Sequence, residues 1–336
     1  MEYRSVGLSG LKASPLCIGT MNFRDAAGER EAEKIAELAR EIGVNFIDTA
    51  DSYGRGDSER IVGRIIARDR ENWVLATKVG SLGGDEPFER GLSRKWMLRA
   101  IDRSLKRLGT DYVDIWYLHM PDDTTPLEES ISAMGDVIAD GKVTYWGFSN
   151  YRGWQVGEII ILCDALGVPR PIICQPHYNA LNRTPETDLL PACDHYGIAV
   201  APYSPVARGV LTGKYEAGRK PPKGTRAHDG DQRMLETEYR EDCIRIAKKV
   251  KAYAEERGMT STQYAILWLL NNAIVASIVA GPRTLGQWQE YVGALDLEFT
   301  SEDEAFLEQL VPTGHPSTPG FTDPRYTYTG RVTLTG

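Results

Sequence analysis

The stretch WVLATKVGSLGGDEPFERGLSRKWMLRAIDRSLKRLGTDYVDIWYLH, residues 73–119, begins and ends with a short apolar run. Runs that are apolar on both faces are typical of parallel strands that helices cover. Between the two runs, Ile101, Leu105 and Leu108 recur at helical spacing, and Gly109 suits a left-handed helix C-cap. The stretch therefore predicts one strand–helix–strand unit.

The same alternation of a strand-like run and a helical run occurs about eight times along the chain. Many of the helical runs end on glycine, as the first one does at Gly43. Eight such units predict an α/β fold of the (β/α)8 TIM-barrel class. The strand-like runs are residues 16–20, 45–50, 73–80, 113–119, 143–150, 172–179, 198–205 and 275–282.

An open doubly wound sheet is the alternative for this alternation. Such a sheet usually shows G-x-G-x-x-G after its first strand, and neither early glycine cluster of this chain matches that pattern. Residues 2–14 predict a short N-terminal hairpin before the barrel. We expect a single domain over 1–336, with the barrel at about 15–296 and an extra C-terminal helix and tail at about 297–336.

The composition and charge of the chain exclude some classes of binding partner. The formal net charge is −8, which gives no electrostatic footprint for nucleic acid or for an anionic membrane. No apolar run approaches the roughly 20 residues of a membrane span, and the first ten residues lack the apolar core of a secretory signal. The five cysteines are scattered, as free thiols in the cytoplasm are. We therefore expect a cytoplasmic protein with a small-molecule ligand, and the composition leaves its oligomeric state open.

Three neighbouring strand-like runs end in a polar side chain that their apolar pattern does not require. Asp48, Lys78 and His119 follow the alternation that points toward the barrel axis, and Tyr53 comes shortly after Asp48. Functional residues of (β/α)8 barrels lie at these C-terminal strand ends. Each residue alone also fits a structural role, as an ion pair, a loop histidine or a packed tyrosine. Their occurrence at equivalent ends of consecutive strands favours a proton-transfer site.

The chemistry of these four side chains is complementary. A tyrosine has a reference pKa near about 10, and a neighbouring ammonium favours the phenolate, which makes the phenol a better acid. Asp48 is the natural partner for a buried Lys78, and His119 could orient a carbonyl oxygen between itself and Tyr53. The second aspartate of this stretch, Asp51, is expected to be solvated or to form a turn.

Five motifs in register resemble the aldo-keto reductase family: IDTADSYG (47–54), LATKVG (75–80), WYLHMPD (116–122), GFSN (147–150) and QPHYN (175–179). The resemblance covers about residues 16–296. It implies a (β/α)8 barrel that binds NADPH and reduces aldehyde or ketone carbonyls to alcohols. It also implies a catalytic tetrad of Asp48, Tyr53, Lys78 and His119. In that tetrad Tyr53 is the general acid, Lys78 and Asp48 tune it, and His119 orients the substrate.

The same resemblance implies two groups of residues at the cofactor's nicotinamide and pyrophosphate. Ser149, Asn150 and Gln175 match positions that hydrogen-bond the carboxamide, which needs both donors and acceptors. Tyr203 matches the ring that stacks on the nicotinamide; Ser149 and Asn150 could instead cap a helix, and Tyr203 could be a core residue. The other residues expected to contact the cofactor here are Gly19, Thr20, Met21, Ser204, Pro205, Val206, Arg208, Gly209, Leu211 and Lys214.

Residues 280–296, AGPRTLGQWQEYVGALD, resemble the adenosine-binding stretch of the family. Arg283 matches a position near the adenosine 2′-phosphate, and arginine is well shaped for phosphate, so NADPH is favoured over NADH. Similar sequences commonly carry Asn where this chain has Tyr291, which leaves the adenine contact open. The residues expected at this end are Gly281, Arg283, Thr284, Gln287, Glu290 and Tyr291.

Two other functions fit parts of the sequence. The family that the motifs resemble includes potassium-channel β subunits that retain tetrad residues, so a cofactor-binding regulatory subunit is an alternative. A metal-dependent hydrolase that uses His119, His177 and Asp122 is weaker, because their spacing makes no convincing ligand set, and we expect no metal.

The sequence does not identify the substrate, because specificity in barrels depends on the βα loops. We expect the pocket walls to come from Met120, residues 22–24, 81–90 and 206–236, and the C-terminal tail, while Trp146 fits either a pocket wall or the core.

Overall fold

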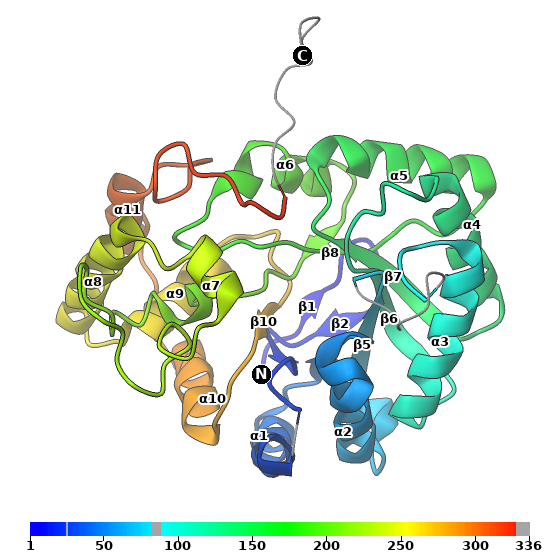
Figure 1. Ribbon diagram of the computed structural model, residues 1–336, viewed down its shortest axis with the longest axis horizontal. Helices are drawn as coiled ribbons and strands as arrows, with labels where there is room; N and C mark the ends of the chain where they lie inside the picture. The colour runs from blue at the N-terminus through cyan, green and yellow to red at the C-terminus, as the bar shows by residue number, and fades with distance from the viewer. Residues whose placement is uncertain (25, 82–88, 327–336) are drawn as a thin grey trace, which may run out of the picture.

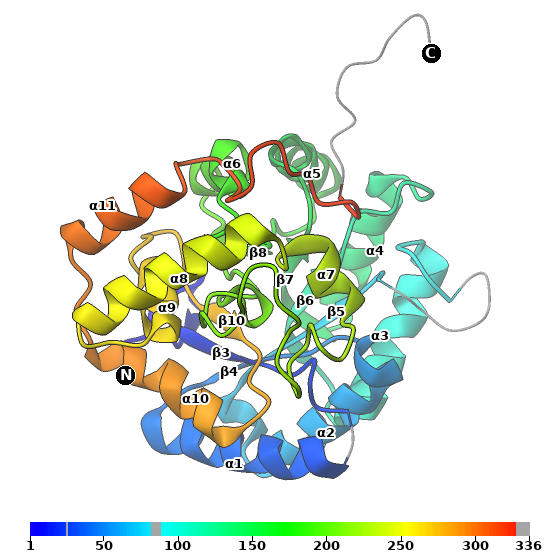
Figure 2. The ribbon, with the colours of Figure 1, turned by 60° about the vertical axis from the view of Figure 1, so that its left-hand side comes forward.

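The computed structural model describes residues 1–24, 26–81 and 89–326 and shows a parallel eight-stranded sheet inside a ring of helices (Figures 1 and 2). The sheet order is β10-β3-β4-β5-β6-β7-β8-β9, so strands that are consecutive in the chain pair with one another. The parallel bridges Val200–Val275 and Tyr203–Val279 connect its two edges. The predicted (β/α)8 barrel is therefore confirmed. The strands are β3 (Leu16–Gly19), β4 (Phe46–Asp48), β5 (Val74–Val79), β6 (Val113–Leu118), β7 (Val143–Ser149), β8 (Ile173–Gln175), β9 (Ala199–Val200) and β10 (Ile278–Ala280).

Helices follow the strands as the periodicity predicts. The helical segment between β8 and β9 is divided into η3 and α6, because Asp188 leaves the helical conformation with a φ of −144°. The α-helices are α1 (Ala26–Ile42), α2 (Asp57–Ile66), α3 (Arg94–Leu108), α4 (Leu127–Ala139), α5 (Gly153–Leu166), α6 (Leu189–His195), α7 (Gln232–Thr237), α8 (Glu241–Glu256), α9 (Ser261–Leu270), α10 (Leu285–Val292) and α11 (Ser301–Leu310). The 3₁₀ turns are η1 (Tyr53–Gly56), η2 (Arg70–Asn72), η3 (Thr184–Thr187), η4 (Ala207–Gly209) and η5 (Gly293–Asp296).

The two ends of α3 show how the local sequence starts and ends the helix that precedes β6. The Ser93 side chain accepts a hydrogen bond from the Trp96 backbone N–H at the start of the helix, and such a cap contributes about 1 kcal/mol. Gly109 ends the helix with a φ of 67°, a conformation that glycine adopts without strain. The chain then turns into β6, and the residue after Leu118 is His119.

The predicted N-terminal hairpin is present as β1 (Arg4–Ser5) and β2 (Lys12–Ala13), which pair antiparallel. Val6 and Ala13 are fully buried in the same apolar cluster as Ile115 on β6. This cluster fills the barrel interior. The hairpin therefore closes the barrel at the end opposite the C-terminal strand ends.

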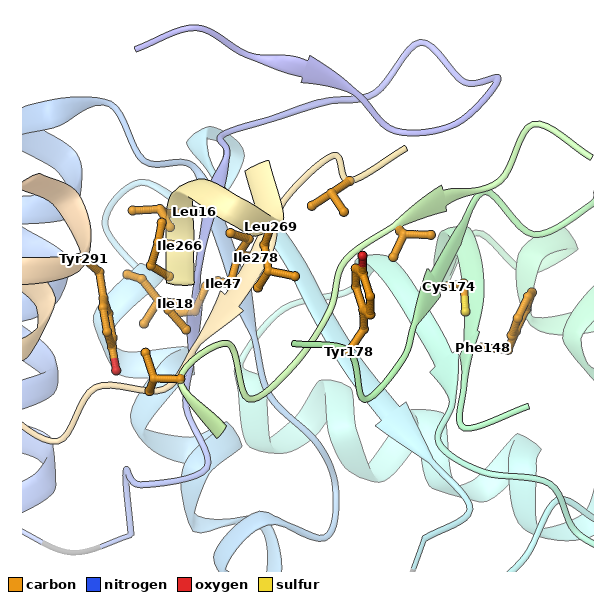
Figure 3. Packing of buried hydrophobic residues seen from close by; sticks show 14 of the residues in the cluster. Leu16, Ile18, Ile47, Phe148, Cys174, Tyr178, Ile266, Leu269, Ile278 and Tyr291 are labelled. Carbon is orange, nitrogen blue, oxygen red and sulfur yellow. The ribbon is translucent and has the colours of Figure 1, made fainter. Parts of the chain in front are cut away.

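A second apolar layer separates the strands from the helices. Ile18, Ile47 and Ile278 belong to neighbouring strands and pack with Ile266 and Leu269 of α9 (Figure 3). Burial of such side chains is the main favourable contribution to the stability of the fold. Among the described helices, none has both the length and the apolar character of a membrane span.

The predicted C-terminal helix is present as α11, and the predicted tail follows it to residue 326, while residues 327–336 lie outside the described residues. After α11 the chain passes α6 and α5 and reaches the side of α7 (Figure 2). Ser317 donates its backbone N–H to the Leu181 carbonyl at 2.9 Å, which fixes this course. The tail therefore approaches the C-terminal ends of the barrel strands.

Candidate active site

A cavity of about 680 Å³ opens at the C-terminal ends of the strands, a volume typical of small-molecule and cofactor sites. Asp48, Tyr53 and His119 all line it. Asp48 ends β4 and His119 follows β6, while Tyr53 begins η1 in the loop after β4. The structure therefore brings these sequence-predicted residues to one place, with Lys78 of β5 behind them.

Lys78 and Asp48 form a salt bridge in which both side chains are buried. The Lys78 ammonium also donates to the Thr49 carbonyl at 2.7 Å, and the Gln175 side-chain amide donates to the second Asp48 oxygen at 2.9 Å. Burial alone would lower the pKa of Lys78, but the Asp48 carboxylate outweighs this and the net pKa is raised. The lysine is therefore held as a cation in the barrel interior.

Tyr53 lies between this cation and His119. The Lys78 ammonium is 5.1 Å from the centre of the Tyr53 ring, and the rings of Tyr53 and His119 are 6.0 Å apart and nearly perpendicular. Burial raises the pKa of Tyr53, and the charge of Lys78 opposes this rise without cancelling it. Lys78 thus acts in the predicted direction, but the net pKa of Tyr53 is above that of free tyrosine.

His119 is a neutral imidazole at physiological pH. Burial holds the pKa of His119 well below its usual value, and the positive charges of Lys78 and Arg325 lower it further. Its Nδ1 is buried and has no hydrogen-bond partner among the described residues. The backbone is fixed on both sides, because the His119 N–H donates to Val79 at 2.8 Å and its carbonyl accepts from Asn150 at 2.8 Å.

Asp51 lies in a turn, which is one of the two expectations for it, and the residue as a whole is half-buried. Its Oδ1 atom is buried without a hydrogen-bond partner among the described residues. Burial, followed by repulsion from Glu59, raises the pKa of Asp51 well above its usual value. The reason is the packing of α2, which brings the fully buried Glu59 behind this loop, where it accepts hydrogen bonds from Thr77 and Arg107.

The residues expected at the nicotinamide line the cavity next to Tyr53. The Tyr203 hydroxyl donates to the Asn150 side chain at 2.9 Å, and the Ser149 hydroxyl donates to the Gln175 carbonyl at 2.6 Å. Helix α5 begins after Arg152, so Ser149 and Asn150 are not its N-cap residues. Asn150 has a φ of 66°, and such left-handed residues cluster at functional sites.

The segment after Tyr203 lies in front of the strands (Figure 2), and several of its residues line the cavity. Of the residues expected there, Ser204, Pro205, Val206, Arg208, Gly209 and Lys214 line the cavity. The Leu211 side chain does not, because it is fully buried in the apolar core. Arg208 is also paired with Glu238, whose pKa is lowered by Arg208 and His177 against the effect of its burial.

Three cations meet at the far end of the cavity. Arg283, Lys214 and Arg226 all line it, and burial followed by repulsion from Arg283 lowers the pKa of both Lys214 and Arg226. Arg226 has one carboxylate nearby, Asp231 at 3.4 Å. Cations that repel one another form a favourable site for a phosphate group. The other residues expected at this end that line the cavity are Gly281, Thr284, Gln287, Glu290 and Tyr291.

The two ends of the cavity together suit a dinucleotide with an additional phosphate. One end offers amide and hydroxyl groups beside Tyr203, and the other offers the three cations. Gly19, Thr20 and Met21, which were also expected near the cofactor, line the same cavity. The residues present therefore fit NADPH.

The family model for the aldo/keto reductase family matches residues 15–312, nearly the whole chain. This chain belongs to the aldo/keto reductase family. Members of the family generally reduce carbonyl groups with NADPH, which supports an oxidoreductase.

Two relatives illustrate the range of the family. A probable voltage-gated potassium channel subunit beta of Arabidopsis thaliana is 38% identical over 302 residues, which cover 88% of this chain and 92% of that protein. An L-glyceraldehyde 3-phosphate reductase of Escherichia coli O157:H7 is 33% identical over 328 residues, which cover 94% of this chain and 93% of that protein. Both matches cover most of this aldo/keto reductase.

The pocket walls of this aldo/keto reductase differ in part from the expectation. Asn22, Arg24 and Ser81 line the cavity, whereas residues 82–88 of the expected loop lie outside the described residues. Trp146 is not a pocket wall: its indole is buried and donates to the Pro169 carbonyl at 2.6 Å. The expected 206–236 loop contributes Arg226 and Arg233 to the cavity wall, and the expected C-terminal tail contributes Arg325 and Tyr326, although the sequence did not mark these side chains individually.

The sequence pointed to the two segments that hold these residues, and the signal is clearest for the 206–236 loop. Arg226 belongs to a long segment rich in proline, glycine and basic residues, which is typical of a loop that covers an anion. Arg325 and Tyr326 lie in an aperiodic tail whose path depends on tertiary contacts.

The hydrolase alternative depends on three side chains that this aldo/keto reductase does not bring together as a ligand set. Within residues 1–24, 26–81 and 89–326, no group of three His, Cys, Asp or Glu side chains is placed to hold a metal ion. His177 is bonded to Glu238 at 2.7 Å, and the Asp122 carboxylate accepts from the Leu92 N–H at 2.8 Å. Each of the two side chains therefore has a structural partner.

Proposed function

We propose that this aldo/keto reductase reduces small aldehydes or ketones to alcohols with NADPH, and that Tyr53 is the proton donor. The observation that supports this proposal is the position of Tyr53, which lies between the buried Lys78–Asp48 pair and a neutral His119 at the wall of one cavity. A positioned acid beside a neutral hydrogen-bonding group is the arrangement that carbonyl reduction requires.

The bound cofactor supplies a hydride to the carbonyl carbon. Tyr53 gives its phenolic proton to the carbonyl oxygen, so that one hydride and one proton convert the carbonyl to an alcohol. His119 orients that oxygen and, being neutral, does not compete as an acid. Lys78 stabilises the phenolate that remains on Tyr53, and Asp48 keeps Lys78 charged and in place.

The raised pKa of Tyr53 suits the direction of reduction. A phenol with a pKa above about 10 is fully protonated at neutral pH, so the proton donor is always loaded. The charge of Lys78 still lowers the free energy of the phenolate relative to an equally buried tyrosine without a neighbouring cation.

The cofactor is proposed to lie along the cavity. Ser149, Asn150 and Gln175 would hold its carboxamide, and Tyr203 would stack on the nicotinamide. Arg283, with Lys214 and Arg226, would hold the 2′-phosphate, which NADH lacks. This cluster is the reason to prefer NADPH over NADH.

The experiment that tests the reaction is NADPH oxidation with 4-nitrobenzaldehyde by wild type and Tyr53→Phe. We expect kcat to fall by about 10²–10⁴ in the variant, with the Kd for NADPH nearly unchanged. Tyr151→Phe is a matched control, because its buried hydroxyl lies outside the cavity and has no partner among the described residues. Unchanged turnover in Tyr53→Phe would exclude Tyr53 as the acid.

A cofactor-binding channel subunit is the second candidate. This candidate is favoured by the Arabidopsis thaliana relative, which is named a probable voltage-gated potassium channel subunit beta and is 38% identical to this chain. Turnover discriminates between the two functions. An enzyme oxidises many equivalents of NADPH per active site with a reactive aldehyde, whereas a protein that binds NADPH and shows no turnover with any aldehyde would support the subunit function.

A further inference from the structure

Two arginines line the substrate end of the cavity, and neither has a carboxylate partner among the described residues. They are Arg24, which precedes α1, and Arg325, in the C-terminal tail. The carboxylates that line the same cavity are engaged elsewhere: Asp48 with Lys78, Asp231 with Arg226, and Glu290 with Thr260. This end of the cavity therefore has an excess of positive charge in a protein whose net charge is −8.

Arg325 is held at the cavity by the fixed path of the tail. The Asp323 carboxylate pairs with both terminal nitrogens of Arg233, and one of its oxygens also accepts the Arg325 backbone N–H at 2.9 Å. Arg152 donates to the Tyr326 carbonyl on the other side. The charge of Asp323 is therefore compensated by Arg233. The charge of Arg325 has no carboxylate partner of this kind among the described residues.

The Arg325 guanidinium lies close to the proposed reaction centre. Its Nη2 is 3.6 Å from the sulfur of Met120, the residue after His119. The charge of Arg325 also contributes to the lowered pKa of His119. Arg24 lies next to the proton donor in the chain fold, because its Cγ would be 3.4 Å from a Cβ placed on Gly54, the residue after Tyr53.

We propose that the substrate is a carbonyl compound with an anionic group, a carboxylate or a phosphate, and that Arg325 binds that group. Arg24 supplies a second positive charge at the same end of the cavity. The guanidinium offers paired N–H donors in a fork that matches both kinds of anion. This inference rests on the proposed carbonyl reduction and specifies its substrate class.

The cofactor does not account for these two arginines. The cations proposed to hold its 2′-phosphate are Lys214, Arg226 and Arg283, which influence one another electrostatically. The cofactor is thus provided with cations of its own, and Arg325 instead contacts Met120, the residue after His119.

The test compares two aldehydes of similar shape, 4-carboxybenzaldehyde and 4-nitrobenzaldehyde, with NADPH and the full-length protein. We expect wild type to have the higher kcat/KM for the carboxylate. Arg325→Met should lower that value by about tenfold or more and leave the value for the nitro compound within about twofold, as expected for the loss of a charge-assisted hydrogen bond. Arg219→Met is the matched control, since Arg219 is exposed outside the cavity and carries the same charge.

A second pair of probes, glyceraldehyde and glyceraldehyde 3-phosphate, distinguishes the two anions. The anion whose kcat/KM depends more strongly on Arg325 is the natural group, and dependence for either one supports the proposal. Arg24→Met should show the same selectivity with a smaller effect.

Three results would overturn the proposal. The first is a wild type whose kcat/KM is no higher for either anionic aldehyde than for its neutral counterpart. The second is an equal loss of kcat/KM for charged and neutral aldehydes in Arg325→Met. The third is a raised Kd for NADPH in that variant, which would place Arg325 at the cofactor. Reduction of 4-nitrobenzaldehyde by wild type in any of these cases would show that the proposed function survives. An absence of turnover with all four aldehydes would instead refute the proposed function.

Discussion

The ammonium of Lys78 and the carboxylate of Asp48 form an ion pair inside the barrel, with side-chain exposures of 0% and 1%. The two residues come from adjacent strands, where Asp48 of β4 is in register with Ala76 of β5, two residues before Lys78. Thr49 and Gln175 complete the polar contacts of the pair. Because both side chains are shielded from water, each charge is stabilised mainly by the other. An unpaired charge at this position would be strongly unfavourable for folding.

The first prediction concerns Asp48→Asn. Breaking a buried ion pair on one side typically lowers the free energy of unfolding by about 3–5 kcal/mol, because the remaining charge stays buried without its partner. Loss of the carboxylate also removes the interaction that raises the pKa of Lys78. We expect kcat for aldehyde reduction to fall by about a hundredfold or more. Thermal unfolding and steady-state kinetics measure the two effects.

The control for this variant is Asp51→Asn, which removes the neighbouring carboxylate from the same loop. Asp51 has no ion pair with Lys78, so its replacement should leave most of the activity intact. If both variants lost activity equally, the Lys78–Asp48 pair would have no special role in turnover.

The second prediction is that Asp51→Asn stabilises the protein at neutral pH. The pKa of Asp51 is raised in the folded state, so folding favours its protonated form. Its stabilising contribution is present below the unfolded pKa of about 3.9 and is lost as the pH rises through the folded pKa. At pH 7 the charged carboxylate is therefore unfavourable, and the variant should have a Tm higher by roughly 2 °C or more.

The pH dependence of the Tm difference tests this prediction. The advantage of Asp51→Asn should shrink as the pH falls toward about 4, where wild-type Asp51 is protonated as well. Asp111→Asn, at an exposed aspartate, should give a difference that stays near zero over the same range. A variant less stable than wild type at pH 7 would contradict the assignment of Asp51 as an unfavourably buried charge.

The contrast between Asp48 and Asp51 shows what the sequence could predict. Strand alternation places Asp48 and Lys78 on the barrel axis, and the barrel itself follows from the repeated strand–helix pattern, so both were predictable. The raised pKa of Asp51 depends in part on the charge of Glu59 on α2, an interaction between a loop and a helix that no periodicity encodes. Arg325 was not predictable for a similar reason, because its position depends on the contact between Asp323 and Arg233. Local sequence thus predicts side chains on regular elements, and tertiary contacts position those on loops and tails.

The third prediction concerns the pH dependence of the two reaction directions. Reduction uses the protonated phenol of Tyr53, and the raised pKa keeps that phenol protonated through neutral and mildly alkaline pH. Oxidation of the alcohol uses the phenolate. As long as the pH is below the pKa of Tyr53, the phenolate fraction rises tenfold for each unit by which the pH increases. We expect reduction to be nearly flat between about pH 6 and 9, and oxidation to rise about tenfold per unit from about pH 7 to 9.

The measurement is kcat/KM in both directions with saturating NADPH or NADP⁺, using one aldehyde and its alcohol. A plateau of the oxidation rate near neutral pH would show that the pKa of Tyr53 is lowered in the complex. In that case the charge of Lys78 would outweigh burial once the cofactor is bound.

The fourth prediction concerns the choice of cofactor. Arg283 is exposed at the end of the cavity where Lys214 and Arg226 also lie, and the three cations repel one another when no anion is present. Arg283→Ala should raise the Kd for NADPH by about 10- to 100-fold, since a charge-assisted contact to phosphate contributes about 1.5–3 kcal/mol. The Kd for NADH, which lacks the 2′-phosphate, should stay within about twofold.

NADH serves as the internal control for this variant, because it shares every other contact with NADPH. Titration of the intrinsic tryptophan fluorescence with each cofactor gives the two dissociation constants for the same preparation. Equal increases for both cofactors would mean that Arg283 contacts a shared part of the dinucleotide. A change for NADPH alone would establish that the three-cation cluster selects the phosphate.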